Sequence, residues 1–175
     1  ENKNFPLKEN EKLNPKNIYA VSKKLSEEMA EMYQKISGIN FVGLRFFTVY
    51  GEWGRPDMFM MKLFKSHMVN KTFYLNNYGN HLRDFTYIDD VVKAVSKIIK
   101  KNFKGHKIFN ICSNNPVNIY DVVKSFDKKN PVKVKLTEIH KADILKTHGS
   151  NKKLTKNISK IKYSDFYNTF YKKFE

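Results

Sequence analysis

Residues 41–58 read FVGLRFFTVYGEWGRPDM, and this stretch decides the fold class. Its first part, residues 41–47, is almost entirely apolar around Arg45 and predicts a buried strand. Residues 48–56 contain two glycines and a proline and predict a loop. Apolar side chains at helical spacing from Asp57 to Val69 predict a helix after it. A strand that leads through a loop into a helix is the repeating unit of an α/β domain.

The rest of the chain continues this alternation. A first helix is predicted to begin at Asn14-Pro15 and to end at Gly38, because Asn caps helices, Pro suits their first turn and Gly ends them. The later predictions, in chain order, are two short strands within 73–87, a helix capped by Asp89 or Asp90 and running to about Lys101, a strand from Lys107 to Cys112, a helix over 118–129 capped by Asn118, a strand over 132–137, and a last helix capped by Ser164. Strands alternating with helices predict parallel pairing.

Composition excludes several protein classes. The chain has 175 residues, 41% of them hydrophobic, which allows one domain or part of a larger one with a real core. Its single cysteine excludes a disulfide scaffold and a Cys-based zinc cluster, and the histidines show no metal spacing. No apolar run approaches the roughly 20 residues that span a bilayer, and the start is charged rather than signal-like. We therefore expect a cytoplasmic protein without a metal site. Because it begins with Glu1 rather than Met, we expect a piece of a longer product.

The net charge of +16 comes almost wholly from lysine, since only three of the 33 basic residues are arginine. The lysines are scattered and mixed with asparagine, which is typical of a solvated surface and not of a stripe that contacts phosphates. No specific nucleic-acid partner is predicted. The alternative, a nucleic-acid-binding domain, would show affinity with a steep salt dependence.

The three arginines are more informative than the lysines. Arginine is needed where a planar, permanently charged group must hold a carboxylate or phosphate at two points. Arg45 lies inside the apolar strand and is predicted to form a structural ion pair. Arg55 and Arg83 lie at segment ends, where sites are built. A structural ion pair remains the alternative for each.

Tyr19 and Lys23 lie four residues apart on the first predicted helix and so share a face. An ammonium close to a phenol favours the phenolate, and such a phenol can exchange a proton with a sugar hydroxyl or ketone. A Tyr-x-x-x-Lys pair also arises often by chance as a surface pair, so its context decides.

Three sequence motifs follow one another along the chain: NIYAVSKK at 17–24, GLRFFTVYGEWGRPDM at 43–58 and RDFTYIDDV at 83–91. Together they closely resemble the extended short-chain dehydrogenase/reductase family of NAD-dependent nucleotide-sugar epimerases and dehydratases. Within it, the chain is most similar to UDP-glucuronate 4-epimerases. The resemblance is strong from residue 14 to about 100 and looser over 105–175.

The resemblance implies the C-terminal part of a Rossmann-type extended short-chain dehydrogenase plus a small α/β sugar-nucleotide domain. Residues 1–55 would form the late part of the NAD-binding domain and carry the Tyr-x-x-x-Lys pair. Residues 56–175 would mainly bind the nucleotide-sugar, with about 83–112 returning to the Rossmann domain. Relatives are typically homodimers through the helix that bears the pair, and a homodimer is therefore possible here.

By the same resemblance, Tyr19 is the catalytic acid/base, and Lys23 holds the nicotinamide ribose and favours ionisation of Tyr19. Phe47 would flank the nicotinamide. Arg83 would contact the UDP pyrophosphate, and Asp143 would reach the uridine ribose. Core packing is the alternative for Phe47, and a surface carboxylate is the alternative for Asp143.

Thr48 and Arg55 carry the substrate prediction. In the glucuronate branch that they resemble, Thr and Arg sit beside the C5 carboxylate of the sugar. The alternative for Arg55 is an ion pair with Glu52 or Asp57 that stabilises the loop.

The implied function is NAD-dependent epimerisation at C4 of a UDP-sugar through a 4-keto intermediate, from UDP-glucuronate to UDP-galacturonate. None of the seven glycines forms a G-x-G-x-x-G turn, so the Gly-rich N-terminal half that binds NAD is missing, and we expect no activity from this chain alone. Two alternatives stay open. One is another nucleotide-sugar 4-epimerase or 4,6-dehydratase, and the other is a non-catalytic sugar-nucleotide-binding remnant.

Overall fold

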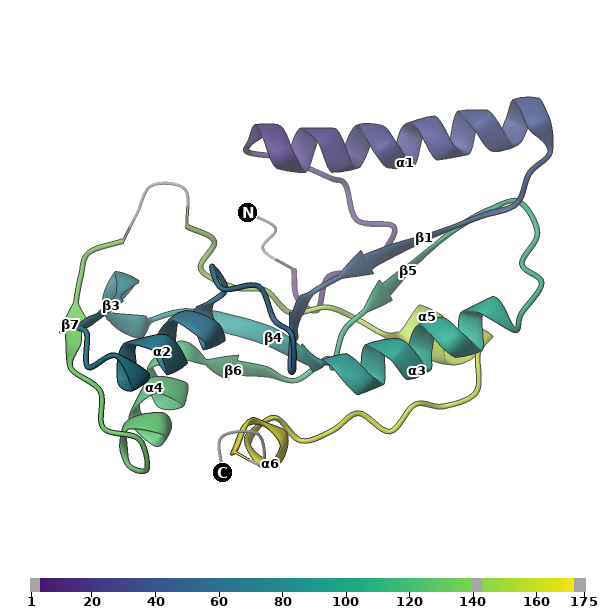
Figure 1. Ribbon diagram of the computed structural model, residues 1–175. Helices are drawn as coiled ribbons and strands as arrows, with labels where there is room; N and C mark the ends of the chain where they lie inside the picture. Colours follow the sequence, from purple (N-terminus) through teal and green to yellow (C-terminus); the bar gives the residue numbers. More distant parts are fainter. Residues whose placement is uncertain (1–3, 140–142, 172–175) are drawn as a thin grey trace.

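A computed structural model describes residues 4–139 and 143–171, and its elements form a mixed α/β unit with parallel strand pairs (Figure 1). The helices and strands, in chain order, are α1 (Ile18–Ser37), β1 (Phe41–Phe46), β2 (Thr48–Tyr50), α2 (Phe59–Met68), β3 (Phe73–Leu75), the 3-10 turn η1 (Asn76–Gly79), β4 (Leu82–Tyr87), α3 (Ile88–Ile99), β5 (His106–Ile111), β6 (Pro116–Asn118), α4 (Ile119–Asp127), β7 (Val134–Leu136), α5 (Lys152–Asn157) and α6 (Phe166–Tyr171).

The first layer is the parallel pair β1–β5, in register from Phe41 opposite His106 to Phe46 opposite Ile111. Helices α3 and α5 cover one face of this pair, and α1 lies across the other (Figure 1). The core between the strands and α3 and α5 is built from apolar residues, namely Val91, Ala94, Ile98, Phe109, Ile111, Leu154, Ile158 and Ile161. This burial, and not hydrogen bonding between two strands, stabilises the layer.

A second core lies around β2, β3 and β4. It joins α2, α4 and α6 through a dense set of aromatic rings, in which Phe85 stacks on Phe166 and Phe166 stacks on Phe170. Aromatic side chains bury large areas, so this small region can support a stable core of its own.

Strand pairing differs from the prediction in two places. The segment 48–56 is not wholly a loop, because β2 pairs in parallel with β4. The two strands predicted within 73–87 both exist, but they do not pair with each other. Strand β3 pairs with β7, whereas β4 pairs with β2 and β6. The turn η1 separates them with two consecutive left-handed residues, Asn77 and Tyr78, so the chain leaves β3 for a different sheet.

Helix ends are partly as predicted. Gly38 ends α1 in the left-handed conformation at φ 71°, and the Asn118 side chain caps α4, as expected. Helix α1, however, begins later than predicted, because the Asn17 side chain and not Asn14 accepts the hydrogen bond of the first turn. The α6 cap is Asp165, one residue after the predicted Ser164, since its carboxylate accepts from the Asn168 N–H.

Other differences from the prediction concern β6, α5 and the start of α3. Strand β6 and helix α5 were not predicted. In α2, Met60 and Leu63 are buried, whereas Met68 is exposed. Neither Asp89 nor Asp90 caps α3, whose first residue follows Tyr87. Asp90 instead accepts from the Ser164 N–H at 2.6 Å.

The apolar stripe of α1 is uncovered within the described part of the chain. This helix of 20 residues has no buried residue, and Ile18, Met29 and Ile36 expose 89%, 70% and 79% of their surface. A helix with a long apolar stripe ordinarily covers it against another element. The stripe is therefore a surface that ordinarily has an occupant.

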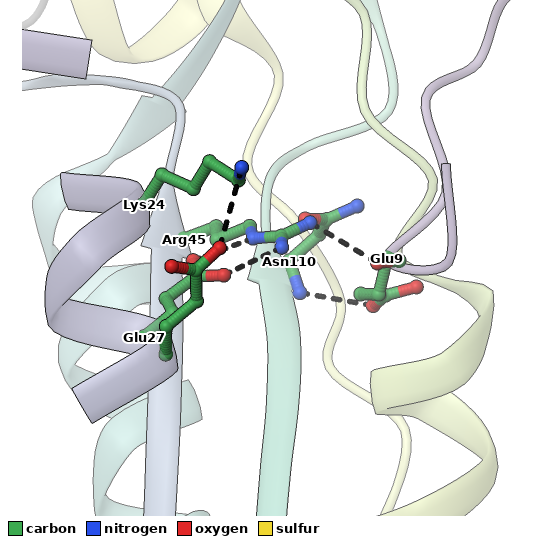
Figure 2. A network of polar contacts seen from close by, with 6 residues as sticks. Glu9, Lys24, Glu27, Arg45 and Asn110 are labelled. Atoms are coloured by element: carbon green, nitrogen blue, oxygen red, sulfur yellow. Dashed lines mark hydrogen bonds and ion pairs between the residues drawn. The ribbon is translucent and has the colours of Figure 1, made fainter. Parts of the chain in front are cut away.

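Arg45 joins α1 to β1 by an ion pair, as its position inside the strand predicted (Figure 2). Its Nε and Nη2 donate to the two carboxylate oxygens of Glu27 at 2.8 and 2.7 Å, and its Nη1 donates to the Glu9 carbonyl oxygen at 3.1 Å. The Glu9 carboxylate in turn accepts from the backbone N–H of Asn110 on β5. A two-point contact of this kind, partly shielded from water, is the geometry that selects arginine over lysine.

Asp84 on β4 is a fully buried carboxylate that ties three segments together. It accepts hydrogen bonds from the N–H and Oγ of Ser113 at 3.1 and 2.7 Å, and from the Gly149 N–H at 3.0 Å. Its own N–H donates to Thr147 Oγ1. Burial raises the pKa of Asp84, while these donors act in the opposite direction.

Replacing Asp84 by alanine is expected to destabilise the protein by about 2–4 kcal/mol, because the buried donors of Ser113 and Gly149 lose their acceptor. Urea unfolding followed by circular dichroism measures the change. The matched control is Asp127→Ala, since Asp127 is exposed and accepts from the Val132 N–H. We expect that control to cost about 1 kcal/mol or less. Equal losses in the two variants would contradict the assigned role of Asp84.

Candidate functional site

The candidate site is a cavity of about 510 Å³ beside the segment that follows β1. Its walls come from this segment, from α2, from the end of β4 and from α6. The lining residues are Phe47, Thr48, Val49, Tyr50, Gly51, Glu52, Trp53, Gly54, Arg55, Met58, Phe59, Met60, Met61, Phe64, Phe85, Tyr87, Ile88, Thr169 and Phe170. A mostly apolar cavity with a few polar groups is the usual form of a small-molecule site.

The shape of this segment depends on Gly51. Its φ is 135°, and a Cβ at this position would lie 2.5 Å from Ile88 Cγ2. Only glycine permits both this conformation and this close approach to α3. Beyond it, Trp53 also has a positive φ of 59° and exposes 99% of its surface. Residues held in sparsely populated conformations are common at binding sites.

A second cavity of about 430 Å³ adjoins the first. Phe47, Thr48 and Met58 line both cavities, so Phe47 and Thr48 lie at their boundary. The second cavity also reaches Leu13 and Arg45, at the N-terminal side of α1 and on β1. A ligand longer than one sugar could therefore contact both.

Arg55 lies at the rim of the first cavity. Its Nη2 lies 3.3 Å from Asp57 Oδ2, in an ion pair whose side chains expose 74% and 63% of their surface. This pair is one of the two alternatives that the sequence left open for Arg55. An exposed ion pair with one contact contributes about 0–1 kcal/mol, so a ligand carboxylate could replace Asp57 at little cost.

Tyr50 also lines the cavity, although no sequence pattern indicated it. Its hydroxyl contacts the Thr169 hydroxyl, and burial raises the pKa of Tyr50 to about 12. A phenol in this state stays protonated at neutral pH, so Tyr50 shapes the wall and does not serve as a base there.

The predicted pair on α1 has the expected local geometry. Lys23 Nζ lies 5.4 Å from the centre of the Tyr19 ring, and Tyr19 exposes 70% of its surface. Both side chains are thus accessible to a ligand. Neither of them lines either cavity. The structure therefore brings together Phe47, Thr48 and Arg55 in one cavity. Tyr19 and Lys23 lie outside it.

The other two predicted residues lie near each other at a different place. Arg83 on β4 donates to the carbonyl oxygens of Leu82 and Leu145 at 3.0 and 3.2 Å. Asp143 belongs to the same returning segment as Leu145, and its Oδ2 lies 3.9 Å from His81 Nε2. His81 was not predicted, because a single histidine before a strand carries no pattern.

No metal-binding group of three or more His, Cys, Asp or Glu occurs within residues 4–139 and 143–171. In the same ranges, none of the helices combines the length and apolarity that crossing a membrane requires. Cys112 is buried, and burial raises the pKa of its thiol, which leaves it unreactive.

The model of the NAD-dependent epimerase/dehydratase family matches residues 1–112, which is more than half of the chain. The chain belongs to this family. An uncharacterized protein of Methanocaldococcus jannaschii is 39% identical over 158 residues, covering 89% of this chain and 48% of that protein. UDP-glucuronate 4-epimerase 4 of Arabidopsis thaliana is 39% identical over 150 residues, covering 77% of this chain and 34% of that protein.

Solved structures of epimerases share the fold. UDP-glucuronic acid 4-epimerase from Bacillus cereus, in complex with UDP-glucuronic acid and NAD, matches with a TM-score of 0.86 at 25% identity, covering 96% of this chain and 55% of that one. The chain spans about half the length of the curated relatives first matched, at 48%, 56% and 48%. These findings confirm the predicted family, its NAD dependence and the Rossmann-type α/β class.

Gly51→Ala is expected to destabilise the protein by about 2–4 kcal/mol, because the new Cβ meets Ile88 and the backbone conformation disfavours any side chain. Gly43→Ala is the matched control. Gly43 lies in β1, and a Cβ there would find its nearest neighbour at 3.5 Å. We expect about 0.5 kcal/mol or less for that change. Urea unfolding of both variants checks the difference, and equal stabilities would refute the assigned constraint.

Proposed function

We propose that the chain is the C-terminal part of a UDP-glucuronate 4-epimerase, which converts UDP-glucuronate to UDP-galacturonate through a 4-keto sugar. The observation that carries this proposal is that Phe47, Thr48 and Arg55 line one cavity. The similarity to the Arabidopsis and Bacillus cereus glucuronate epimerases supports it.

The proposed division of the chain follows the sequence. Residues 1–55 would belong to the NAD-binding domain and 56–175 mainly to the substrate domain, with about 83–112 returning to the first. The parallel pairing of β1 with β5 agrees with this return, because β5 lies within 83–112. A Gly-rich N-terminal half, absent from this sequence, would complete the cofactor site.

The residues that are present suit the nicotinamide end of NAD. Tyr19 and Lys23 are accessible on one face of α1, and Phe47 offers an aromatic ring at the boundary of two cavities. When bound, NAD supplies the uptake and return of a hydride at C4. Lys23 would hold the nicotinamide ribose, and its ammonium lies beside the Tyr19 ring.

Tyr19 would move the proton. Its phenolate oxygen accepts the proton of the C4 hydroxyl as the 4-keto sugar forms. After the sugar has turned over in the site, the phenol donates the proton back to the C4 oxygen. The phenol thus returns the proton that it took, so the exchange at Tyr19 involves no net proton transfer.

Thr48 and Arg55 would hold the C5 carboxylate of the sugar. Oxidation at C4 makes a β-keto acid, which tends to lose carbon dioxide. An arginine that fixes the carboxylate out of alignment with the ketone protects the intermediate. For this, Arg55 would leave Asp57 and bind the sugar carboxylate instead, which the weakness of the exposed ion pair allows.

Arg83 and Asp143 would bind the nucleotide, Arg83 at the pyrophosphate and Asp143 at the uridine ribose. A second copy of the chain is the proposed occupant of the exposed apolar stripe of α1, which would make the protein a homodimer.

The first test is Arg55→Ala in the complete gene product. Turnover of UDP-glucuronate is expected to fall about 10- to 100-fold, since a charge-assisted contact contributes about 1.5–3 kcal/mol. Binding of UDP-glucose, which has no carboxylate, should be spared. Steady-state kinetics and calorimetric titration measure the two quantities.

Asp57→Asn is the matched control, because it removes the ion pair but keeps Arg55. If Arg55 only stabilises the loop, both variants should lose activity alike. Retained activity in Asp57→Asn together with loss in Arg55→Ala supports the carboxylate role. Unchanged glucuronate turnover in Arg55→Ala would refute it.

The intact mass of the native gene product tests the proposed N-terminal half. We expect a product much heavier than the 20.7 kDa of this chain. Mass spectrometry of the protein isolated from its host gives the answer. A native product of 20.7 kDa would mean that the cofactor half comes from a separate partner or that turnover is lost.

A further inference from the structure

His81 is a buried histidine close to Arg83 and Asp143, the two residues proposed to bind the nucleotide. It lies between η1 and β4 and exposes 6% of its surface. Its backbone is fixed on both sides, since its N–H donates to the Gly79 carbonyl oxygen and its carbonyl oxygen accepts from the Ile119 N–H. The backbone of His81 therefore has a defined place, and the imidazole is buried.

The imidazole faces the carboxylate of Asp143. Nε2 of His81 lies 3.9 Å from Oδ2 of Asp143. Both atoms are buried, and neither has a hydrogen-bond partner in the part of the chain that the structure describes. Buried polar atoms are ordinarily satisfied, so two of them that face each other indicate a contact that can tighten. The Asp143 side chain still exposes 29% of its surface, so its outer part is accessible to a ligand.

The segment that carries Asp143 is anchored just beyond it. The Leu145 carbonyl oxygen accepts from the Leu82 N–H at 2.9 Å, and the Thr147 N–H donates to the Leu82 carbonyl oxygen at 2.9 Å. These bonds fix the backbone after Asp143 but not its carboxylate. His81 precedes Leu82, the residue that anchors this segment, and its imidazole faces the Asp143 carboxylate.

The charge of His81 responds to its surroundings. Burial lowers the pKa of His81, the nearby Arg83 lowers it further, and Asp143 opposes them. Among the described residues, η1 and α4 contact His81 through the backbone of Gly79 and Ile119. Neither contact brings a charged group to His81 beyond Arg83 and Asp143. The lowered pKa favours the neutral imidazole, which gains its charge as the pH falls.

We propose that His81 is a positioning residue for Asp143: its protonated imidazole holds the carboxylate in the orientation that receives the ribose hydroxyls of a UDP-sugar. This inference rests on the proposed function, in which Asp143 contacts the ribose. Protonation pulls Oδ2 toward Nε2 and leaves the outer oxygen directed at the ligand. UDP-sugar binding then tightens as the pH falls through the His81 pKa.

Linkage gives this proposal a second, reciprocal signature. If protonation of His81 tightens binding by some factor, saturation with the UDP-sugar raises the His81 pKa by the logarithm of the same factor. The imidazole signal in an NMR titration reports that pKa without any turnover.

The test measures the affinity of the complete gene product for UDP-glucose between about pH 5.5 and 7.5, the range in which histidine titrates. A UDP-sugar has no titrating group of its own there. We expect binding to become about fivefold tighter toward the acidic end. His81→Gln should lose the pH dependence. His67→Gln is the control, because His67 contacts the Pro131 carbonyl oxygen elsewhere, and it should keep the dependence.

Asp143→Asn distinguishes two ways in which His81 could act. His81 could position Asp143, or its charge could attract the phosphates of the UDP-sugar directly. If His81 acts through Asp143, this variant binds more weakly and without pH dependence. A pH dependence that persists in Asp143→Asn would overturn the positioning role. Circular dichroism at each pH checks that every variant is folded.

The two proposals fail in different ways. Binding of UDP-glucose that is equally tight at every pH overturns the role of His81 and leaves the proposed function standing. Absence of UDP-glucose binding at any pH overturns the proposed function, and the inference with it.

Discussion

The buried carboxylate of Asp84 is the constraint on which the arrangement of this chain depends. Asp84 lies in β4, and its carboxylate oxygens accept hydrogen bonds from Ser113, just after β5, and from Gly149 on the returning segment. It therefore joins the layer around β1 and β5 to the aromatic core around β4. The junction also helps to place the segment that carries Asp143, because the Gly149 N–H on Asp84 adds to the backbone bonds of Leu82 with Leu145 and Thr147.

Periodicity and caps made most of the helices predictable. Gly38 and Asn118 act locally, through a left-handed turn and a side-chain cap, and such local effects are readable from sequence. Strand partners were not predictable. The β3–β7 and β2–β4 pairs have three residues each, and tertiary packing rather than local pattern selects their partners. The start of α1 was misplaced because both Asn14 and Asn17 are good caps and only the fold chooses between them.

The candidate site was predictable where its residues are neighbours in sequence. Phe47, Thr48 and Arg55 follow one strand, so one cavity can collect them. Tyr19 and Lys23 were paired correctly by helical spacing. The contact of His81 with Asp143 joins residues far apart in the chain, and no local pattern could indicate it. Tyr50 was not predictable for another reason, since burial in the folded chain, which no local pattern shows, raises the pKa of its phenol.

Helix α1 is held to its sheet in an unusual way for an element that carries the proposed catalytic pair. It has no buried residue, and the contacts that join it to the strands include the Arg45–Glu27 ion pair and the edge of the Tyr33 ring against Phe41. Electrostatic attachment weakens with ionic strength, whereas apolar burial does not. The Arg45 and Glu27 side chains expose only 21% and 24% of their surface, so salt screens this pair less than it screens an exposed one. The placement of Tyr19 therefore depends on contacts that lie outside both cores, and loss of the Glu27 carboxylate would loosen the helix from the strands while leaving both cores intact.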